Sequence, residues 1–206
     1  MNTFKLTLMA TLFLSTHFAQ AGVLDFSGNI CGDGSQACVN YSAINQSYGD
    51  IAGQLDVIYD GNISAPSTSN LSWWDNYSGQ PGVAWGDNGA TSEIFLSPLA
   101  GYQVTLTSLT FGSYNNATRN SQFTLLDGNN NVLSASNTFS LLNPLTFALN
   151  VTSTSGIKIQ WGPDAYNVGI DNVNFTITAV PEAETYAMMF AGLAFMGSLA
   201  RRRKVS

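Results

Sequence analysis

Apolar and polar residues alternate along the middle of this 206-residue chain. In residues 55–59, 147–151 and 157–161 every second side chain is apolar, as in β-strands that bury one face. No stretch of residues 22–180 follows a helical period. Turn dipeptides lie between such runs, at Asp60-Gly61, Asn88-Gly89 and Asp127-Gly128. Many short strands with polar turns predict an all-β fold, an antiparallel β-sandwich of the jelly-roll type.

Two strand-like segments, residues 102–112 and 168–178, contain a break in this alternation. In each segment the apolar side chains change phase part of the way along. One extra residue has to be absorbed, so we expect β-bulges near Thr107-Ser108 and Asp171-Asn172.

The N-terminus has the three parts of a secretory signal. Lys5 supplies positive charge, residues 6–14 are apolar, and Ala19-Gln20-Ala21 fits a small-x-small cleavage site. The alternative, an N-terminal membrane anchor, would need about 20 apolar residues, roughly twice this run. We therefore expect residues 1–21 to be removed on export and the mature chain to begin at Gly22.

A second apolar run, residues 186–200, is followed by the basic cluster Arg201, Arg202, Arg203 and Lys204. The run is short for a membrane span, but flanking residues can extend it. Basic residues directly after it hold that end in the cytoplasm. The pattern predicts a short transmembrane helix, with 22–180 as an exported domain and 181–206 as a tail.

Charge is scarce in the predicted domain. Between residues 22 and 180 there are eleven acidic side chains and only two basic ones, Arg119 and Lys158, so the net charge is −9. Binding of nucleic acid needs many Lys and Arg contacts to phosphate and is excluded. Docking of the domain on an anionic membrane is disfavoured for the same reason.

Histidine and cysteine usage removes further chemistries. The only histidine is His17, inside the signal, so Ser-His-Asp catalysis and His-ligated zinc are excluded for the mature domain. Cys31 and Cys38 are the only cysteines, and in an exported chain they predict a local disulfide. Closing so short a loop contributes roughly 2.5 kcal/mol in the chain-entropy model.

Aromatic residues give the clearest indication of a binding site. Trp73, Trp74, Tyr77 and Trp85 lie close together in sequence among Asp, Asn and Gly residues. Sugar rings stack on flat aromatic faces, while amides and carboxylates bind the hydroxyl groups. Adjacent strand residues point to opposite faces, so we expect one of Trp73 and Trp74 to fill the core instead. Trp161 and Tyr166 are a second, weaker candidate pair.

The tail resembles the PEP-CTERM sorting signal of Gram-negative bacteria. Val180, Pro181, Glu182 and Ala183 stand where that signal has its Pro-Glu-Pro motif, with Ala183 replacing the second proline. The resemblance implies transient anchoring in the inner membrane and processing by an exosortase. It also implies delivery to the cell envelope or the exopolysaccharide of a biofilm matrix. A plain single-pass anchor is the alternative.

Residues 91–178 are weakly similar to carbohydrate-binding jelly rolls, through features such as residues 101–106 and 168–175. Such domains often hold a structural calcium between their first and last strands. By this analogy Asp25 and Asp171 are the candidate ligands, and calcium is the one cofactor expected. The acidic turn that starts at Asp127 lacks the Gly and Glu that an EF-hand needs at its sixth and twelfth positions.

These features predict an exported, non-enzymatic surface or matrix protein with a structural or adhesive role, binding exopolysaccharide or another envelope glycan. One alternative is a membrane-anchored adhesin or sensor that keeps its tail. The other is a glycan-active enzyme. Glycoside hydrolysis needs two carboxylates, and Glu93 is the only glutamate of the domain, with Asp75 and Asp87 near it in sequence.

Overall fold

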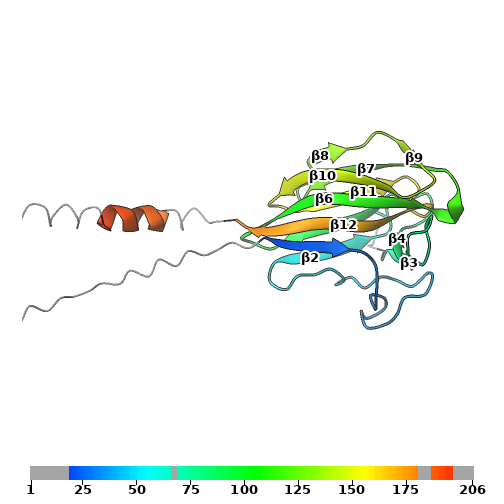
Figure 1. The fold of residues 1–206 in the computed structure, drawn as a ribbon, viewed down its shortest axis with the longest axis horizontal. Helices are drawn as coiled ribbons and strands as arrows, with labels where there is room; N and C mark the ends of the chain where they lie inside the picture. The colour runs from blue at the N-terminus through cyan, green and yellow to red at the C-terminus, as the bar shows by residue number, and fades with distance from the viewer. Residues whose placement is uncertain (1–18, 66–68, 181–186, 197–206) are drawn as a thin grey trace, which may run out of the picture.

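The computed structural model describes residues 19–65, 69–180 and 187–196, and in them twelve β-strands form two antiparallel six-stranded sheets (Figure 1). The first sheet has the order β10-β6-β12-β4-β3, with β1 also paired to β12. The second has the order β2-β5-β11-β7-β8, with β9 also paired to β7. The elements are β1 (Gln20–Leu24), β2 (Leu55–Asp60), β3 (Ser72–Trp74), β4 (Val83–Trp85), β5 (Ser92–Pro98), β6 (Tyr102–Ser113), the 3-10 helix η1 (Tyr114–Asn116), β7 (Arg119–Asp127), β8 (Val132–Ala135), β9 (Phe139–Leu141), β10 (Leu145–Ser153), β11 (Ile157–Gly162) and β12 (Val168–Ala179).

The chain crosses between the sheets at most of its connections. From β4 to β7, and again from β9 to β12, each strand lies in the opposite sheet from the strand before it. Repeated crossing of this kind is typical of a jelly roll. The antiparallel β-sandwich predicted from the sequence is confirmed.

The core lies between the two sheets and follows the predicted alternation. The inward side chains of β2 and β11 are almost fully buried, namely Leu55, Val57, Tyr59, Ile157, Ile159 and Trp161. In β10 the same alternation gives side chains that are only partly buried. β10 is an edge strand of the first sheet, so one side of it has no neighbouring strand to cover it.

Both predicted bulges are present where β6 pairs with β12. The register shifts between Asp171 and Asn174, and again between Asn174 and Phe175. The first shift places an extra residue in β12, and the second shift places an extra residue in β6. The two bulges therefore cancel, and the original register is restored after them. Asn172 takes a left-handed conformation with φ of 49° at this point. The bulges keep apolar side chains on the inner face after the change of phase.

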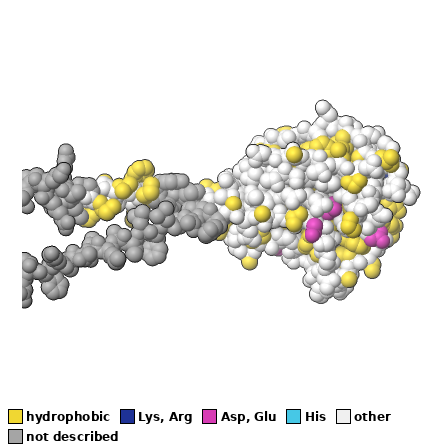
Figure 2. All heavy atoms as spheres, viewed as in Figure 1, with side chains coloured by type: hydrophobic (Ala, Val, Ile, Leu, Met, Phe, Trp, Pro, Cys, Tyr) yellow, Lys and Arg dark blue, Asp and Glu magenta, His cyan; other side chains and the backbone are white. Residues whose placement is uncertain are grey.

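The outer face of the first sheet is polar and carries little charge. Figure 2 looks onto this face and shows few acidic side chains and no Lys or Arg. Threonine hydroxyls pair across its strands, with oxygens 2.7 Å apart for Thr105 and Thr152 and 2.8 Å apart for Thr110 and Thr146. Hydroxyl pairs of this kind satisfy polar groups without charge.

The two ends of the domain leave the sandwich together. β1 lies antiparallel to the last part of β12, with Gln20 opposite Ile177, and β12 ends at Ala179, directly before the tail (Figure 1). The predicted cleavage before Gly22 falls inside β1, and the domain boundaries at 21 and 180 stay predictions. Most of the predicted signal, residues 1–18, lies outside the described residues.

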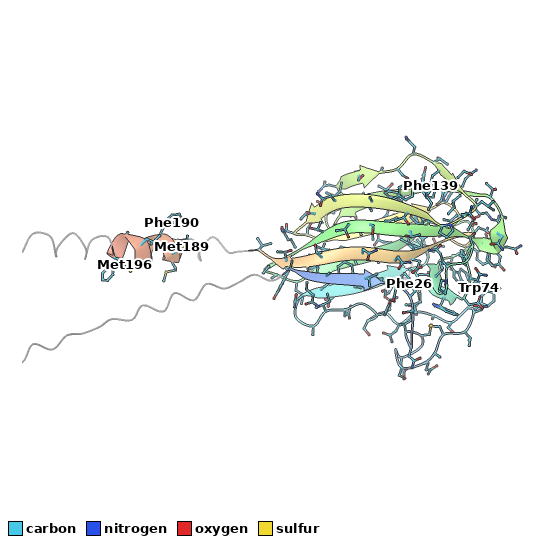
Figure 3. The ribbon with its side chains drawn as sticks, in the orientation of Figure 1. Phe26, Trp74, Phe139, Met189, Phe190 and Met196 are labelled. Atoms are coloured by element: carbon cyan, nitrogen blue, oxygen red, sulfur yellow. A yellow bond between two sulfur atoms is a disulfide. The ribbon has the colours of Figure 1, made fainter. Side chains whose placement is uncertain are left out.

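Part of the predicted tail helix is described. Residues 187–196 are helical, and their large apolar side chains, among them Met189, Phe190 and Met196 in Figure 3, are exposed. No helix of the described part of the chain has both the length and the apolarity to cross a membrane. Residues 181–186, with most of the sorting motif, and 197–206, with the basic cluster, lie outside the described residues.

Candidate functional site

A cluster of aromatic side chains lies at the end of the sandwich opposite the tail, where Figure 3 labels Trp74. The strands β3 and β4 with their connecting turn supply three of its rings, and η1, the loop before β12 and the loop before β2 supply one each. We call it the distal aromatic cluster, made up of Tyr41, Trp74, Tyr77, Trp85, Tyr114 and Tyr166. Most of its neighbouring rings meet edge to face, the geometry that aromatic pairs favour.

Tyr77 forms the base of this cluster. It is 1% exposed, and its hydroxyl donates a hydrogen bond of 2.6 Å to the carbonyl oxygen of Tyr166. It packs over two glycines that face each other on β6 and β12. A Cβ on Gly112 would lie 2.8 Å from the Tyr77 carbonyl oxygen, and one on Gly169 3.2 Å from Tyr77 Cδ1. Larger residues at these positions would lift the β3–β4 connection off the sheet.

The two adjacent tryptophans point in opposite directions. Trp73 packs against the main core, and its indole N–H donates a hydrogen bond of 2.8 Å to the carbonyl oxygen of Phe26. Trp74 points the other way and meets the Tyr114 ring with centroids 5.4 Å apart. The structure therefore assigns Trp73 to the scaffold. Of the other sequence-predicted aromatics, Tyr77 and Trp85 are buried, with 1% and 8% exposed, and Trp74 is half-buried.

Tyr41 completes the cluster from a distant part of the sequence. Its ring centroid lies 4.8 Å from that of Trp74 and 5.7 Å from that of Trp85, and 60% of the residue is exposed. A hydrogen bond with Tyr41 is the main reason that the pKa of Tyr166 is raised. Tyr41 has a φ of 74°, which is unfavourable for a bulky residue and persists only where neighbouring contacts hold it.

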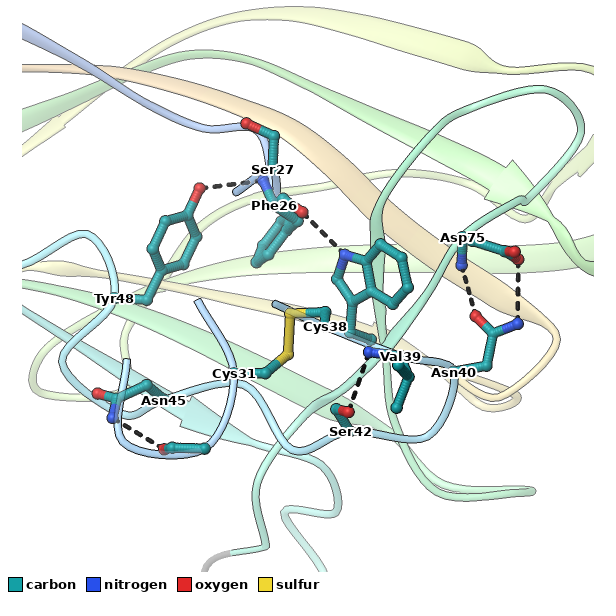
Figure 4. Close-up of a disulfide and its surroundings, with 12 residues drawn as sticks. Phe26, Ser27, Cys31, Cys38, Val39, Asn40, Ser42, Asn45, Tyr48 and Asp75 are labelled. Carbon is teal, nitrogen blue, oxygen red and sulfur yellow. Dashed lines mark hydrogen bonds between the residues drawn. A yellow bond between two sulfur atoms is a disulfide. The ribbon is translucent and has the colours of Figure 1, made fainter. Parts of the chain in front are cut away.

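The loop that carries Tyr41 is held at several points. The predicted Cys31–Cys38 disulfide closes its first part (Figure 4). The Asn40 side chain donates to Asp75 Oδ1 at 3.2 Å and accepts from the Asp75 backbone N–H at 2.9 Å. The backbone N–H of Tyr41 donates to the carbonyl oxygen of Trp73 at 3.0 Å. These hydrogen bonds hold the loop against β3. The position of Tyr41 therefore depends on the hydrogen bonds and on the disulfide.

An open pocket of about 230 Å³ adjoins the cluster. The Trp74 and Tyr114 rings form one part of its wall, and hydrophilic side chains form the rest. Its lining consists of Trp74, Asp75, Asn76, Ser78, Tyr114, Asn115 and Asn116. Two aromatic rings beside a carboxylate, three amides and a hydroxyl can contact both faces and edges of a polar ring-shaped ligand.

The candidate calcium ligands lie near each other. Asp25 follows β1, which pairs with β12 up to Val173, and Asp171 is in the adjoining part of β12. Burial raises the pKa of Asp171 to about 7, and the charge of Asp25 adds to this effect. Asp25 has a lowered pKa, since hydrogen bonds from Ser27 and Tyr48 outweigh its burial.

A calcium site needs more oxygen ligands than these two carboxylates. No group of three or more His, Cys, Asp or Glu side chains in the described residues is arranged to hold a metal ion. Calcium binding by Asp25 and Asp171 therefore stays a prediction.

Glu93 lies away from the distal aromatic cluster. It is on β5 of the second sheet, where it stands opposite Asp60, and its Oε2 accepts a hydrogen bond of 2.7 Å from Gln160. Asp75 follows β3 of the first sheet. The structure thus does not bring Glu93 and Asp75 together as a catalytic pair.

Sequence reasoning missed two of the six members of the distal aromatic cluster and grouped a third with the wrong residue. Tyr41 and Tyr114 are far from the Trp-rich segment in sequence, and Tyr166 was paired with Trp161, which is fully buried. Two sequence features could have indicated the missing members: a tyrosine just after the cysteine loop, and the glycines at positions 112 and 169. Neither indicates on its own which segments meet.

Comparison with known proteins supports the assignment of the tail. The model of the PEP-CTERM protein-sorting motif matches residues 179–204, which confirms the motif predicted from Val180, Pro181, Glu182 and Ala183 and the basic residues after the helix. No curated protein sequence matches the chain.

Similar solved structures include two carbohydrate-binding modules, as the weak resemblance had predicted. One is a mutant of a family 29 module complexed with mannohexaose, with 16% identity and a TM-score of 0.37 over 77% of this chain and 92% of that chain. The other is a CBM4 structure, with 11% identity and a TM-score of 0.33 over 61% of this chain and 87% of that chain.

Proposed function

We propose that this chain is an exported, non-catalytic glycan-binding protein that an exosortase sorts to the cell envelope or the exopolysaccharide matrix of a Gram-negative bacterium. Its tail anchors it transiently in the inner membrane before processing. The match of the sorting motif to residues 179–204 is the observation that carries the sorting part. The glycan-binding part rests on the distal aromatic cluster and its pocket.

The arrangement of the pocket suits a sugar ring. Carbohydrates present C–H groups on their faces and hydroxyl groups at their edges. Trp74 and Tyr114 offer ring surface, and Asn76, Asn115 and Asn116 offer both donors and acceptors at the rim. The site is open to solvent, which fits a polymer chain that continues past it.

The position of the cluster also fits a surface role. The tail leaves at Ala179 from one end of β12, and the cluster lies at the other end of the same strand, where β12 pairs with β4. A protein attached through its tail would therefore present the cluster to the surrounding polysaccharide.

Replacing Trp74, a half-buried ring that lines the pocket, tests glycan binding. We expect Trp74→Ala to weaken retention on exopolysaccharide purified from the host by roughly tenfold, since loss of one stacking ring removes about 1.4 kcal/mol. The measurement is affinity electrophoresis in gels that contain the polysaccharide, together with the melting temperature of each variant.

Two variants serve as controls. Phe95→Ala removes a half-buried ring from β5 of the second sheet and should leave retention unchanged. Trp73→Ala should lower the melting temperature, because its indole packs on the core. Normal retention of a folded Trp74→Ala variant would reject the distal aromatic cluster as the binding site.

A further inference from the structure

The charges around the pocket are all of one sign. Asp75 is the only ionised side chain that lines it, and neither cationic side chain of the domain is part of the lining. Lys158 lies on β11, where its ammonium donates to Asn130 Oδ1 at 2.6 Å and lies 5.4 Å from the centre of the Phe95 ring. Arg119 begins β7 in the second sheet. The residues that line the pocket therefore supply no counter-charge for a carboxylate or sulfate group.

The whole domain reinforces this preference. Residues 22–180 carry a net charge of −9, which repels polyanions and attracts cations at low ionic strength. Part of this net charge lies far from the pocket. Salt screens most of the attraction that this distant part exerts on a ligand. Asp75, at the pocket itself, provides the short-range part of the attraction.

The contacts of Asp75 leave it able to bind a ligand. Its Oδ1 accepts the Asn40 amide, and its backbone N–H is bound to the same side chain, so the carboxylate is oriented. Oδ2 accepts no hydrogen bond from the described residues, and Asp75 is exposed. The carboxylate thus stands beside Trp74 with one free oxygen.

Aromatic rings next to a carboxylate form a good environment for a cation. An ammonium group over the face of Trp or Tyr gains cation–π attraction, and a nearby carboxylate adds a charge-assisted hydrogen bond. Trp74, Tyr114 and Asp75 line the same pocket and supply both interactions. A neutral sugar uses the rings alone, whereas a sugar with a free amino group uses the rings and the carboxylate.

We propose that the preferred ligand is a glycan with free amino groups, such as a polymer of hexosamine that lacks part of its N-acetyl groups. Its ammonium group binds with the Trp74 and Tyr114 rings on one side and Asp75 on the other. The amides of the rim bind the hydroxyl groups. This inference rests on the proposed glycan-binding function and specifies the chemistry of the ligand.

A set of four oligosaccharides tests the preference, with the mature protein and isothermal titration calorimetry. The probes are hexamers of glucosamine, N-acetylglucosamine, glucose and galacturonate, at a pH where the amines are protonated. We expect the glucosamine hexamer to bind roughly threefold to thirtyfold more tightly than the two neutral hexamers. We expect the galacturonate hexamer to bind most weakly and the preference for glucosamine to decline with added salt.

Asp75→Asn is the diagnostic variant. Its amide oxygen can still accept the Asn40 bond, so the loop keeps its anchor while the charge is lost. The preference for glucosamine should decrease to the part that cation–π attraction alone supplies. Asp56→Asn, which removes an equal charge from β2 of the second sheet, should leave the preference unchanged.

The outcomes separate this inference from the proposed function. Equal binding of neutral and amino hexamers that Trp74→Ala abolishes would reject the amino-sugar preference and leave glycan binding intact. Tighter binding of the galacturonate hexamer would also reject it. No binding of any hexamer or of the host polysaccharide would reject both.

Discussion

Asp171 is the only charged side chain that is buried among the described residues, with 2% of its surface exposed. Gln80 donates to its Oδ2 at 3.3 Å, and the Asn172 backbone and side chain each donate at 2.7 Å. These bonds favour the ionised form, but burial outweighs them and raises the pKa to about 7. The folded protein therefore holds this proton more tightly than the unfolded chain does.

The raised pKa of Asp171 predicts a pH dependence of stability. The folded state gains from protonation of Asp171, so the free energy of unfolding should fall as the pH rises from about 4, the unfolded pKa, to about 7. Asp171→Asn should flatten this slope and raise stability at pH 8. The measurement is urea unfolding between pH 5 and 8 in calcium-free buffer.

Asp75→Asn is the control for the Asp171 experiment, since Asp75 is exposed and should leave the slope as it is. An unchanged slope in Asp171→Asn would show that another group controls it. Calcium that binds to Asp25 and Asp171 would favour the ionised carboxylate, so loss of the slope on adding calcium would support the calcium site.

At the residue scale, the sequence predicted features that depend on residues close together in the chain. The disulfide follows from two cysteines in an exported chain, and the split between Trp73 and Trp74 follows from alternation in a strand. Tyr41 was not predicted as part of the site. Its place depends on a left-handed backbone and on the hydrogen bonds between its neighbour Asn40 and Asp75, which lie 35 residues apart.

At the level of elements, the loop between β1 and β2 acts as a brace for the site. The Cys31–Cys38 disulfide lies between the core and the segment that carries Tyr41, and Cys31 is 2% exposed. This loop thus joins the stability of the fold to the geometry of the distal aromatic cluster.

Removal of the disulfide should affect both properties. We expect Cys31→Ser/Cys38→Ser to lower the free energy of unfolding by roughly 2.5 kcal/mol and to weaken glycan binding by about twofold to tenfold. The first effect comes from the freed loop in the unfolded state and the second from loss of the Tyr41 position. Chemical unfolding and calorimetric titration with the glucosamine hexamer measure the two effects.

Tyr41→Ala separates the two effects of the disulfide. In the oxidised protein it should weaken binding to a similar degree but leave most of the stability, because Tyr41 is 60% exposed. If the double cysteine variant lost stability yet bound normally, the loop would not position the site.

Element-level prediction was strong for strands and weak for their assembly. Alternation indicated β2 and β11, and its breaks located the bulges of β6 and β12. The packing of the β3–β4 connection over Gly112 and Gly169 was not predicted. It depends on contacts between segments that are distant in sequence, which no local pattern encodes.

At the level of the whole molecule, the sorting tail and the candidate binding site lie at opposite ends of one strand, β12. β12 is paired at its end with β1, which begins the described domain, and the tail follows directly. The distal aromatic cluster lies at the opposite end. Under the proposed function, the chain is held at one end by a membrane or an acceptor and binds polysaccharide at the other.

Processing at the tail is the event on which this arrangement depends. We expect the protein recovered from the envelope or matrix fraction of its host to begin at Gly22 and to lack everything beyond about Pro181-Glu182, with any added mass reporting an acceptor. Intact-mass spectrometry of each cell fraction measures both ends. Replacing Pro181 and Glu182 by alanine should keep the full tail and hold the protein in the inner membrane. A native chain that still ended at Ser206 there, in a host with a working exosortase, would instead identify a permanently anchored adhesin or sensor.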